Sequence, residues 1–282
     1  MYILIVLLLS IAFFGIYKAY KNTHQFTLNR IKINSPERET TSKLNILHIS
    51  DMHLENISIT PEQLFESLQG EPIDLIALTG DFLDRKRSLS KLPQYLKVFQ
   101  CLNPTYGTYA VFGNHDYVLN KDHFSTLEKT LREHDCRTLR NENNTIDING
   151  MSVNLIGIDN FGTGHSDLDK AYKNLPETGF NLVLTHDPNV VLNMKETPYD
   201  YLLSGHFHGG QIHWPKPYHL IKMGKLVRLN MVKGLHHMNG KPFYISEGLG
   251  QTGFNIRVGS RPEITLHEVN MKIAESKNEV AS

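Results

Sequence analysis

The sequence has little cysteine, a single tryptophan and no surplus of charge of either sign. Only Cys101 and Cys136 are present, too few for a disulfide framework. Lysine and arginine number 29, as do aspartate and glutamate, so the chain as a whole is not suited to coat a nucleic acid. No repeat or low-complexity segment is visible, and 40% hydrophobic residues are too many for a disordered protein. The 282 residues therefore fit one large domain or two small ones with a substantial core.

Charged side chains are missing from the first 17 residues, which read MYILIVLLLSIAFFGIY. As a helix this run covers roughly 25 Å at about 1.5 Å per residue, close to a hydrocarbon core of about 30 Å. Ala19 and Tyr20 extend it, and Lys18 and Lys21 can reach the lipid headgroups. We therefore predict a transmembrane anchor over residues 1–20.

A cleaved signal peptide and a buried core helix stay open as alternatives for this segment. A signal peptide has basic residues before its apolar run and small residues at its cleavage site, whereas here Ala-Tyr-Lys-Asn follows the run. The lysines and arginines nearest the run all lie on its C-terminal side. The positive-inside rule then predicts a single-pass protein of the cell membrane with its main domain on the cytoplasmic face, and export is the alternative.

Beyond the anchor, residues 21–43 are polar and are expected to form a tether with one candidate strand over 27–33. Short apolar runs bounded by turn residues then predict buried strands, at 44–49, 73–78, 108–112, 153–158, 182–184 and 201–203. Helical patterns occupy residues 61–68, 89–102 and 123–134. Alternating strands and helices predict an α/β fold. We assign this domain to residues 44–270 and a polar tail to 271–282.

The sequence contains 15 histidines, and several of them follow the predicted strands. The residues at these positions are Asp51, His53, Asp81, Asn114, His115, Asp116, His186, His206 and His208. They offer nitrogen and oxygen ligands but no sulfur, which suits two divalent ions such as Mn²⁺, Fe²⁺ or Zn²⁺. Ions about 3.5–4 Å apart form a two-metal hydrolytic site. There Asp81 would bridge the ions and a hydroxide between them would be the nucleophile.

Each of these residues alone has an ordinary structural explanation. An aspartate after a strand is usually a turn or cap residue, and a lone histidine is usually a satisfied polar group. The ordered set of five such blocks, each after a predicted strand, favours a metal site.

The blocks D-x-H, G-D, G-N-H-D, H and G-H-x-H resemble the calcineurin-like metallophosphoesterase superfamily over residues 44–268. The string GHFHGGQIHWP is similar to its bacterial branch of membrane-associated or exported phosphoesterases, although Phe207 replaces the usual threonine. The resemblance implies a four-layer α/β/β/α sandwich with metals at the strand ends. Asp84 occupies the position of the tyrosine ligand of purple acid phosphatases, which excludes that branch.

The resemblance also implies a role for each block residue. Asp51, His53, Asp81 and His208 would hold the first metal, and Asp81, Asn114, His186 and His206 the second. His115 would face the phosphoryl group, stabilise developing charge and protonate the leaving oxygen. Asp116 would orient His115 through a hydrogen bond.

No acidic residue occurs between Asp200 and Glu247, whereas six lysines and arginines do. Apolar and aromatic residues alternate with them, so this stretch could form a basic, apolar lip for a phospholipid or lipid-linked phosphate. An ordinary β-hairpin with solvated lysines is the alternative. Nothing else supports a nucleic-acid partner, and we expect none.

The sequence therefore predicts a dinuclear phosphoesterase that hydrolyses a phosphate ester or pyrophosphate of a lipid-related substrate at the membrane. One alternative is a phosphodiesterase or phosphatase acting on a soluble nucleotide or phosphoprotein. Another is a catalytically silent scaffold.

Overall fold

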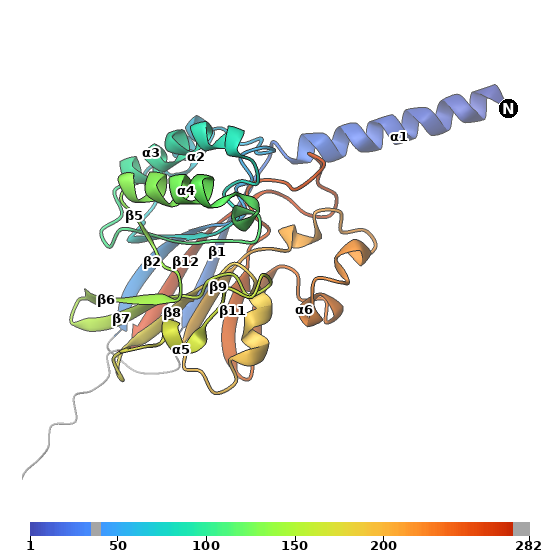
Figure 1. The fold of residues 1–282 in the computed structure, drawn as a ribbon. Coiled ribbons are helices and arrows are strands. Elements are labelled where there is room, and N and C mark those ends of the chain that lie inside the picture. Colours follow the sequence, from blue (N-terminus) through green and yellow to red (C-terminus); the bar gives the residue numbers. More distant parts are fainter. Residues whose placement is uncertain (35–40, 273–282) are drawn as a thin grey trace, which may run out of the picture.

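Two six-stranded sheets face each other in the computed structural model, which describes residues 1–34 and 41–272 (Figure 1). The first sheet has the order β1-β12-β2-β3-β4-β5 and the second has the order β10-β11-β9-β8-β7-β6. Within each sheet, four neighbouring strands run parallel: β2 to β5 in the first, and β11, β9, β8 and β7 in the second.

The strands of the first sheet are β1 (Thr27–Asn34), β2 (Thr41–Ile49), β3 (Leu75–Thr79), β4 (Thr108–Val111), β5 (Cys136–Thr138) and β12 (Glu263–Lys272). Those of the second are β6 (Glu142–Ile148), β7 (Met151–Gly157), β8 (Phe180–Leu184), β9 (Tyr201–Ser204), β10 (Gly234–Met238) and β11 (Lys241–Ile245). The α-helices are α1 (Tyr2–Asn22), α2 (Pro61–Leu68), α3 (Leu92–Leu102), α4 (Lys121–Glu133), α5 (Leu168–Ala171) and α6 (Lys225–Arg228). Short 3-10 turns cover η1 (Lys86–Lys91), η2 (Asp116–Val118), η3 (Pro188–Asn193), η4 (His208–Gly210) and η5 (Tyr218–Leu220).

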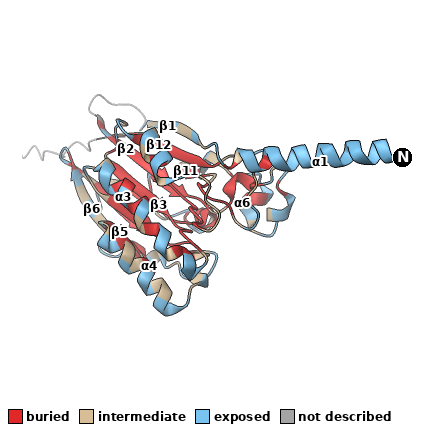
Figure 2. Ribbon diagram, turned by 90° about the horizontal axis from the view of Figure 1, so that it is seen from above, coloured by how far each residue is buried: buried red, intermediate tan, exposed pale blue. Residues whose placement is uncertain are grey.

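Three layers of apolar packing establish the predicted four-layer sandwich. Helices α2, α3 and α4 pack on the outer face of the first sheet, where Leu64, Phe99 and Leu127 meet its strands. A second cluster lies between the sheets, and a third packs α5, η3 and α6 on the outer face of the second sheet. The strands between these layers are buried, whereas α1 is exposed along most of its length (Figure 2).

Local signals explain where the helices begin. Thr60 caps α2 through a capping box with Gln63, and Pro61 occupies the first turn. The helix predicted from residue 89 begins instead at Leu92, because Pro93 is tolerated only in a first turn, and η1 precedes it.

The segment 21–43 differs from the tether that the sequence predicted. The candidate strand over 27–33 forms β1, which pairs with β12 over eight residues, from Thr27 with Glu263 to Asn34 with Asn270. The sandwich therefore begins at Thr27 rather than at residue 44. The partner strand β12 lies more than 200 residues away in the sequence, so local patterns could not show this pairing. Apart from its first two residues, which end β12, the predicted tail lies outside the described residues.

Among the described residues, α1 is the helix long and apolar enough to cross a membrane. Its last turn is docked on the sandwich, because the backbone N–H of Arg257 donates to the carbonyl of Ala19 at 2.9 Å. The side-chain amide of Asn22 in turn donates to the carbonyl of Arg257, also at 2.9 Å. The end of α1 is therefore fixed to the domain by its backbone at Ala19 and by the side chain of Asn22.

Candidate metal centre

The predicted ligands follow the carboxyl ends of parallel strands from both sheets. Asp51 and His53 follow β2, Asp81 follows β3, Asn114 and His115 follow β4, His186 follows β8, and His206 and His208 follow β9. In α/β folds these strand ends meet at one edge, where ligands bind. The structure accordingly brings the predicted ligands together.

Backbone strain marks this edge. Asp51, His53, Asp81, His206 and His208 all have positive φ angles, between 38° and 77°. Such a conformation costs a non-glycine residue about 1–3 kcal/mol and persists where the surroundings impose it, often at functional sites. Close packing also explains two glycines of the motif blocks. A Cβ atom at Gly113 would collide with the Asp81 side chain, and one at Gly205 would collide with Ser50 and Asp51.

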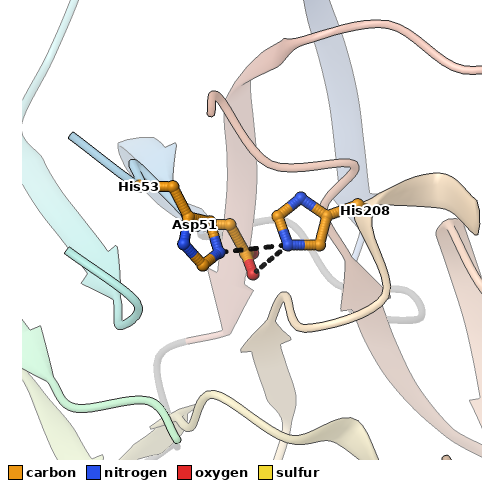
Figure 3. A group of neighbouring side chains, drawn as sticks. All are labelled: Asp51, His53 and His208. Carbon is orange, nitrogen blue, oxygen red and sulfur yellow. Dashed lines mark hydrogen bonds and ion pairs between the residues drawn. The ribbon is translucent and has the colours of Figure 1, made fainter. Parts of the chain in front are cut away.

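One ligand group consists of Asp51, His53 and His208 (Figure 3). The Nε2 atoms of the two histidines face each other at 3.2 Å. Oδ1 of Asp51 lies 3.3 Å from Nε2 of His208. All three side chains are buried, so these donor atoms converge on one point away from bulk water.

A second group consists of Asp81, His186 and His206. Nε2 of His186 lies 3.0 Å from Oδ2 of Asp81 and 3.1 Å from Nδ1 of His206. The same Oδ2 atom of Asp81 lies 3.5 Å from Nε2 of His53 in the first group. Asp81 therefore sits between the two groups, where a bridging carboxylate is expected.

Hydrogen bonds orient these side chains, and the buried carboxylates make the site favourable for a cation. Nδ1 of His186 donates to the carbonyl of Thr79 at 2.8 Å, which directs Nε2 into the site. Burial would lower the pKa of His186, but Asp81 and Asp51 raise it to about 10. Burial would likewise raise the pKa of Asp51, but His208 and His186 hold it below its ordinary value. The two buried carboxylates thus favour positive charge at this position.

Asn114 completes the donor set. Its Oδ1 atom is buried and has no hydrogen-bond partner among the described residues, and the residue lines the same cleft as Asp81 and His206. An unpaired buried carbonyl oxygen is costly unless something binds it. Nitrogen and oxygen donors of this kind fit borderline divalent ions, so the residues present fit the implied metals.

The structure corrects the role that the sequence predicted for Asp116. Its carboxylate does not orient His115 but accepts hydrogen bonds from four backbone N–H groups, those of Asp81, Phe82, Leu83 and Gly113, at 2.9–3.3 Å. Asp116 is buried and holds the loops after β3 and β4 in place. Although Asp116 follows His115 in the sequence, its carboxylate binds backbone N–H groups. The tight loops leave these N–H groups without another acceptor.

Asp84 is the acid that lies beside His115. Its Oδ2 atom is 3.7 Å from Nδ1 of His115, and its Oδ1 atom is 3.6 Å from Nδ1 of His53. The contact with His115 holds the pKa of Asp84 well below its usual value. From the sequence, Asp84 served to exclude the purple acid branch, and its contact with His115 was not predicted. The sequence signal for this contact was the position of Asp84, three residues after the predicted ligand Asp81 on the same loop.

Arg257 is a buried residue that sequence reasoning missed altogether. Its guanidinium donates to the backbone carbonyls of His208, Glu247, Gly248, Gly250 and Arg261 at 2.6–3.2 Å. The Arg257 backbone also donates to the carbonyl of Ala19, and His208 is a predicted ligand. Arg257 therefore joins the end of α1 to the first ligand group. No local pattern distinguishes such an arginine from a solvated one.

A cleft of about 230 Å³ opens beside the ligand groups. Its polar lining includes Asp81, Asn114, His115, His206 and His208. Its apolar lining includes Phe207, Ile212, Leu220, Met223 and Phe254. An anionic group that enters this cleft therefore meets apolar side chains next to the ligand groups.

The stretch without acidic residues divides into two parts. Lys233 pairs with Glu247 at 3.0 Å, and Lys241 donates to the carbonyls of Lys195 and Thr197, so these lysines stabilise the β10–β11 hairpin region. Lys216, Lys222, Lys225 and Arg228 are instead exposed on the loops and the short helix that precede this hairpin. The second half of the stretch thus forms the hairpin of the alternative, but its lysines are paired with protein groups instead of being solvated.

A two-sheet sandwich with nitrogen and oxygen ligands at its strand ends fits a metal-dependent hydrolase. The chain belongs to the calcineurin-like phosphoesterase family, whose model matches residues 44–210. The family uses divalent metals, and the two ligand groups could hold them.

Three relatives illustrate the range of the family. The chain is 59% identical over 255 residues to the metallophosphoesterase YkoQ of Bacillus subtilis (strain 168), covering 90% of this chain and 94% of that one. It is 27% identical over 239 residues to the phosphodiesterase YaeI of Escherichia coli (strain K12), covering 82% and 84%. It is 26% identical over 280 residues to the UDP-2,3-diacylglucosamine pyrophosphatase LpxG of Chlamydia trachomatis (serovar D), covering 79% and 82%.

Proposed function

We propose that this chain is a membrane-tethered, two-metal phosphoesterase that hydrolyses a phosphate ester or pyrophosphate bond of a lipid-related substrate. The observation that carries the proposal is the cleft, in which Ile212, Leu220, Met223 and Phe254 stand beside the ligand groups. Apolar walls favour a substrate with acyl or prenyl chains over a fully polar one. The similarity to a pyrophosphatase named for a diacylated nucleotide sugar supports the same substrate class.

In this proposal, Asp51, His53, Asp81 and His208 hold the first metal, and Asp81, Asn114, His186 and His206 hold the second. When bound, such ions supply charge neutralisation at the phosphate and an activated water molecule. The chain does not distinguish Mn²⁺, Fe²⁺ and Zn²⁺ by ligand type, since all three accept these donors.

His115 is the proposed general acid. It lines the cleft, and 28% of its side chain is exposed to solvent, so a substrate can reach it. Asp84 beside its Nδ1 atom favours the protonated ring and leaves Nε2 free to face the leaving oxygen. Asp84 is thus a positioning residue for His115.

We also propose that α1 is an uncleaved anchor and that the catalytic domain lies on the cytoplasmic face. Ala19 and Asn22 at the end of α1 contact Arg257 in the domain, so a cleavage near residue 20 would disrupt this contact. Lys18 and Lys21 lie on the domain side of the apolar run, as the positive-inside rule expects for a cytoplasmic flank.

A substrate panel tests this proposal. The full-length protein in nanodiscs, reconstituted with Mn²⁺, is assayed on phospholipids and on a diacylated nucleotide pyrophosphate. The deacylated form of the same pyrophosphate, a cyclic nucleotide and a phosphopeptide serve as soluble comparisons. Because each buried CH₂ contributes about 0.8 kcal/mol, burial of even two methylenes raises kcat/KM for the acylated substrate roughly tenfold.

The matched control is Asp81→Ala, which removes the bridging carboxylate and is expected to abolish hydrolysis of every substrate. Equal kcat/KM for acylated and deacylated pyrophosphate would reject the lipid-related substrate while leaving the hydrolase intact. Activity of Asp81→Ala equal to that of the unchanged chain would reject the metal site itself.

A further inference from the structure

Large hydrophobic side chains are exposed beside the cleft. Beyond α1 in the chain, eight such side chains are exposed among the described residues, and five of them lie in two neighbouring loops. We call these five the apolar rim: Ile212, Trp214, Tyr218, Ile221 and Phe254, with exposed fractions from 39% to 79%. Soluble surfaces usually carry such residues singly, whereas a cluster marks an interaction site.

Hydrogen bonds join the two loops of the apolar rim into one surface. The side-chain amide of Gln211 donates to the carbonyls of Thr252 and Phe254 at 2.9 and 3.0 Å. Ile212 forms a β-bridge with Val258. Ile212 and Phe254 also line the cleft, so the rim surrounds part of its mouth.

The apolar rim is continuous with the base of α1. Val258 follows Arg257, whose backbone bonds to Ala19 and Asn22 at the end of the helix. In two perpendicular views, α6 and the loops around it lie on the side of the sandwich from which α1 projects (Figures 1 and 2). A bilayer crossed by α1 would therefore face the rim.

Charge around the apolar rim matches a lipid surface. Lys216 and Lys222 lie within the same loop, and Lys225 and Arg228 follow on α6, all of them exposed. Residues 201–246 contain no acidic side chain. Aromatic side chains flanked by lysines are typical of segments that sit at the headgroup level, where rings are buried and ammonium groups meet lipid phosphates.

We propose that the apolar rim inserts into the interfacial layer of the bilayer that α1 crosses, so that the metal cleft opens at the membrane surface. The rim and α1 then hold the domain at two points, which fixes its orientation. A lipid substrate would reach the ligand groups without leaving the bilayer completely. This inference rests on the anchor in the proposed function but not on the identity of the substrate.

The single tryptophan of the chain tests the proposal directly, because Trp214 belongs to the apolar rim and is 78% exposed. The full-length protein is placed in nanodiscs of phosphatidylcholine with phosphatidylglycerol, and Trp214 emission is compared with that in nanodiscs of bromine-labelled lipids. We expect the Trp214 emission to be blue-shifted in unlabelled nanodiscs. In the labelled nanodiscs, we expect most of the emission intensity to be lost through quenching. Raising the phosphatidylglycerol fraction is expected to increase the quenching.

Two variants act as controls. In Trp214→Phe with Lys195→Trp, the tryptophan moves to position 195, which precedes β9. This position lies toward the end of β9 opposite to the ligand groups. We expect bromine-labelled lipids to leave its emission unchanged. In Tyr218→Asp with Ile221→Asp, Trp214 is retained while two apolar contacts are replaced by charge. These substitutions are at exposed positions, and we expect them to restore most of the emission lost to quenching.

Water-exposed emission of Trp214 without quenching would overturn the proposal, because the apolar rim would then face solvent. Blue-shifted emission without quenching would also overturn it and would indicate a protein partner or a second copy on the rim. Quenching of Trp214 in a protein that hydrolyses acylated and deacylated substrates equally would support the docking and reject only the lipid-related substrate. The two proposals therefore fail separately.

Discussion

The carboxylate of Asp84 lies between two histidines with different roles, the proposed ligand His53 and the proposed acid His115. A bridging carboxylate of this kind can fix the ring of His115 only if the loop after β3 is correctly folded. Asp116 serves that purpose by binding four N–H groups of the two loops. Asp84 thus orients His115, whereas Asp116 holds the two loops in their folded form.

Substitution of His115 and Asp84 distinguishes these roles. We expect His115→Ala to lower kcat on an ester with a strongly basic leaving group by about 10²–10⁴-fold, the usual contribution of general acid catalysis. Asp84→Asn keeps a polar group but removes the charge, so we expect a smaller loss. Both losses should nearly vanish on a p-nitrophenyl diester, whose leaving group needs little protonation.

The measurement is kcat for both esters, together with metal content by atomic emission. Retained metal with a leaving-group-dependent loss supports the assignment. An equal loss on both esters in His115→Ala would show that the histidine acts on structure or metal binding instead of on proton transfer.

At the scale of elements, β2 and β12 place two histidines between the sheets. Nε2 of His48 lies 2.8 Å from Oγ1 of Thr79, and Nδ1 of His267 lies 2.8 Å from the hydroxyl of Tyr201. Tyr244 and Glu263 are close to them, hydrogen-bonded to each other at 2.8 Å. Both histidines are completely buried. Burial lowers the pKa of His48 to about 3, although Asp51 opposes this shift, and burial also lowers the pKa of His267.

These buried histidines predict loss of stability at mildly acidic pH. The folded pKa of His48 lies below its ordinary value of about 6.5, so the unfolded chain binds a proton that the folded chain does not. The contribution of neutral His48 to the free energy of unfolding is therefore complete above pH 6.5 and decreases as the pH falls below it. Between pH 7 and pH 5 the free energy of unfolding is expected to fall by about 2 kcal/mol for this one group.

His48→Gln is the matched variant, since its amide can replace Nε2 toward Thr79 but does not titrate. Urea denaturation of both proteins at pH 7 and pH 5, in detergent and with a chelator, gives the difference. Between pH 7 and pH 5, we expect the free energy of unfolding to fall by about 2 kcal/mol less in the variant than in the unchanged chain. An identical pH dependence would mean that His48 is not buried in its neutral form.

The elements also show the limit of sequence patterns. The capping signals at Thr60 and Pro61 predicted α2 at its observed bounds, because a helix start depends on neighbouring residues. The strands β6 and β12 were not predicted, because polar residues alternate through them and mask their apolar face. The place of β1 beside β12 depends on a distant partner, which composition does not indicate.

On the scale of the whole molecule, the proposed cytoplasmic position of the domain can be tested with the chain's own cysteines. The chain carries its own reporter, because Cys101 on α3 is exposed and Cys136 is buried. Burial raises the pKa of Cys136 to about 12, so its thiol does not react at neutral pH. Reaction with a maleimide therefore reports on Cys101.

If the domain is cytoplasmic, a membrane-impermeant maleimide should not label the protein in intact cells and should label it after permeabilisation. Cys101→Ser should remain unlabelled in both conditions and is the control. Labelling of Cys101 in intact cells would place the domain outside and would reverse the orientation inferred from Lys18 and Lys21.

The sequence by itself determined the family, the α/β class, the apolar first helix and the side chains of both ligand groups. These properties depend on short blocks in which residue type and spacing carry the chemistry, so they are readable without the fold. Only the tertiary structure decided that Asp84, not Asp116, accompanies His115, and that Arg257 connects α1 to the loop of His208. It also gathered Trp214 and Phe254 into one surface. Such contacts join residues from distant parts of the chain, and their partners exist only once the strands have assembled.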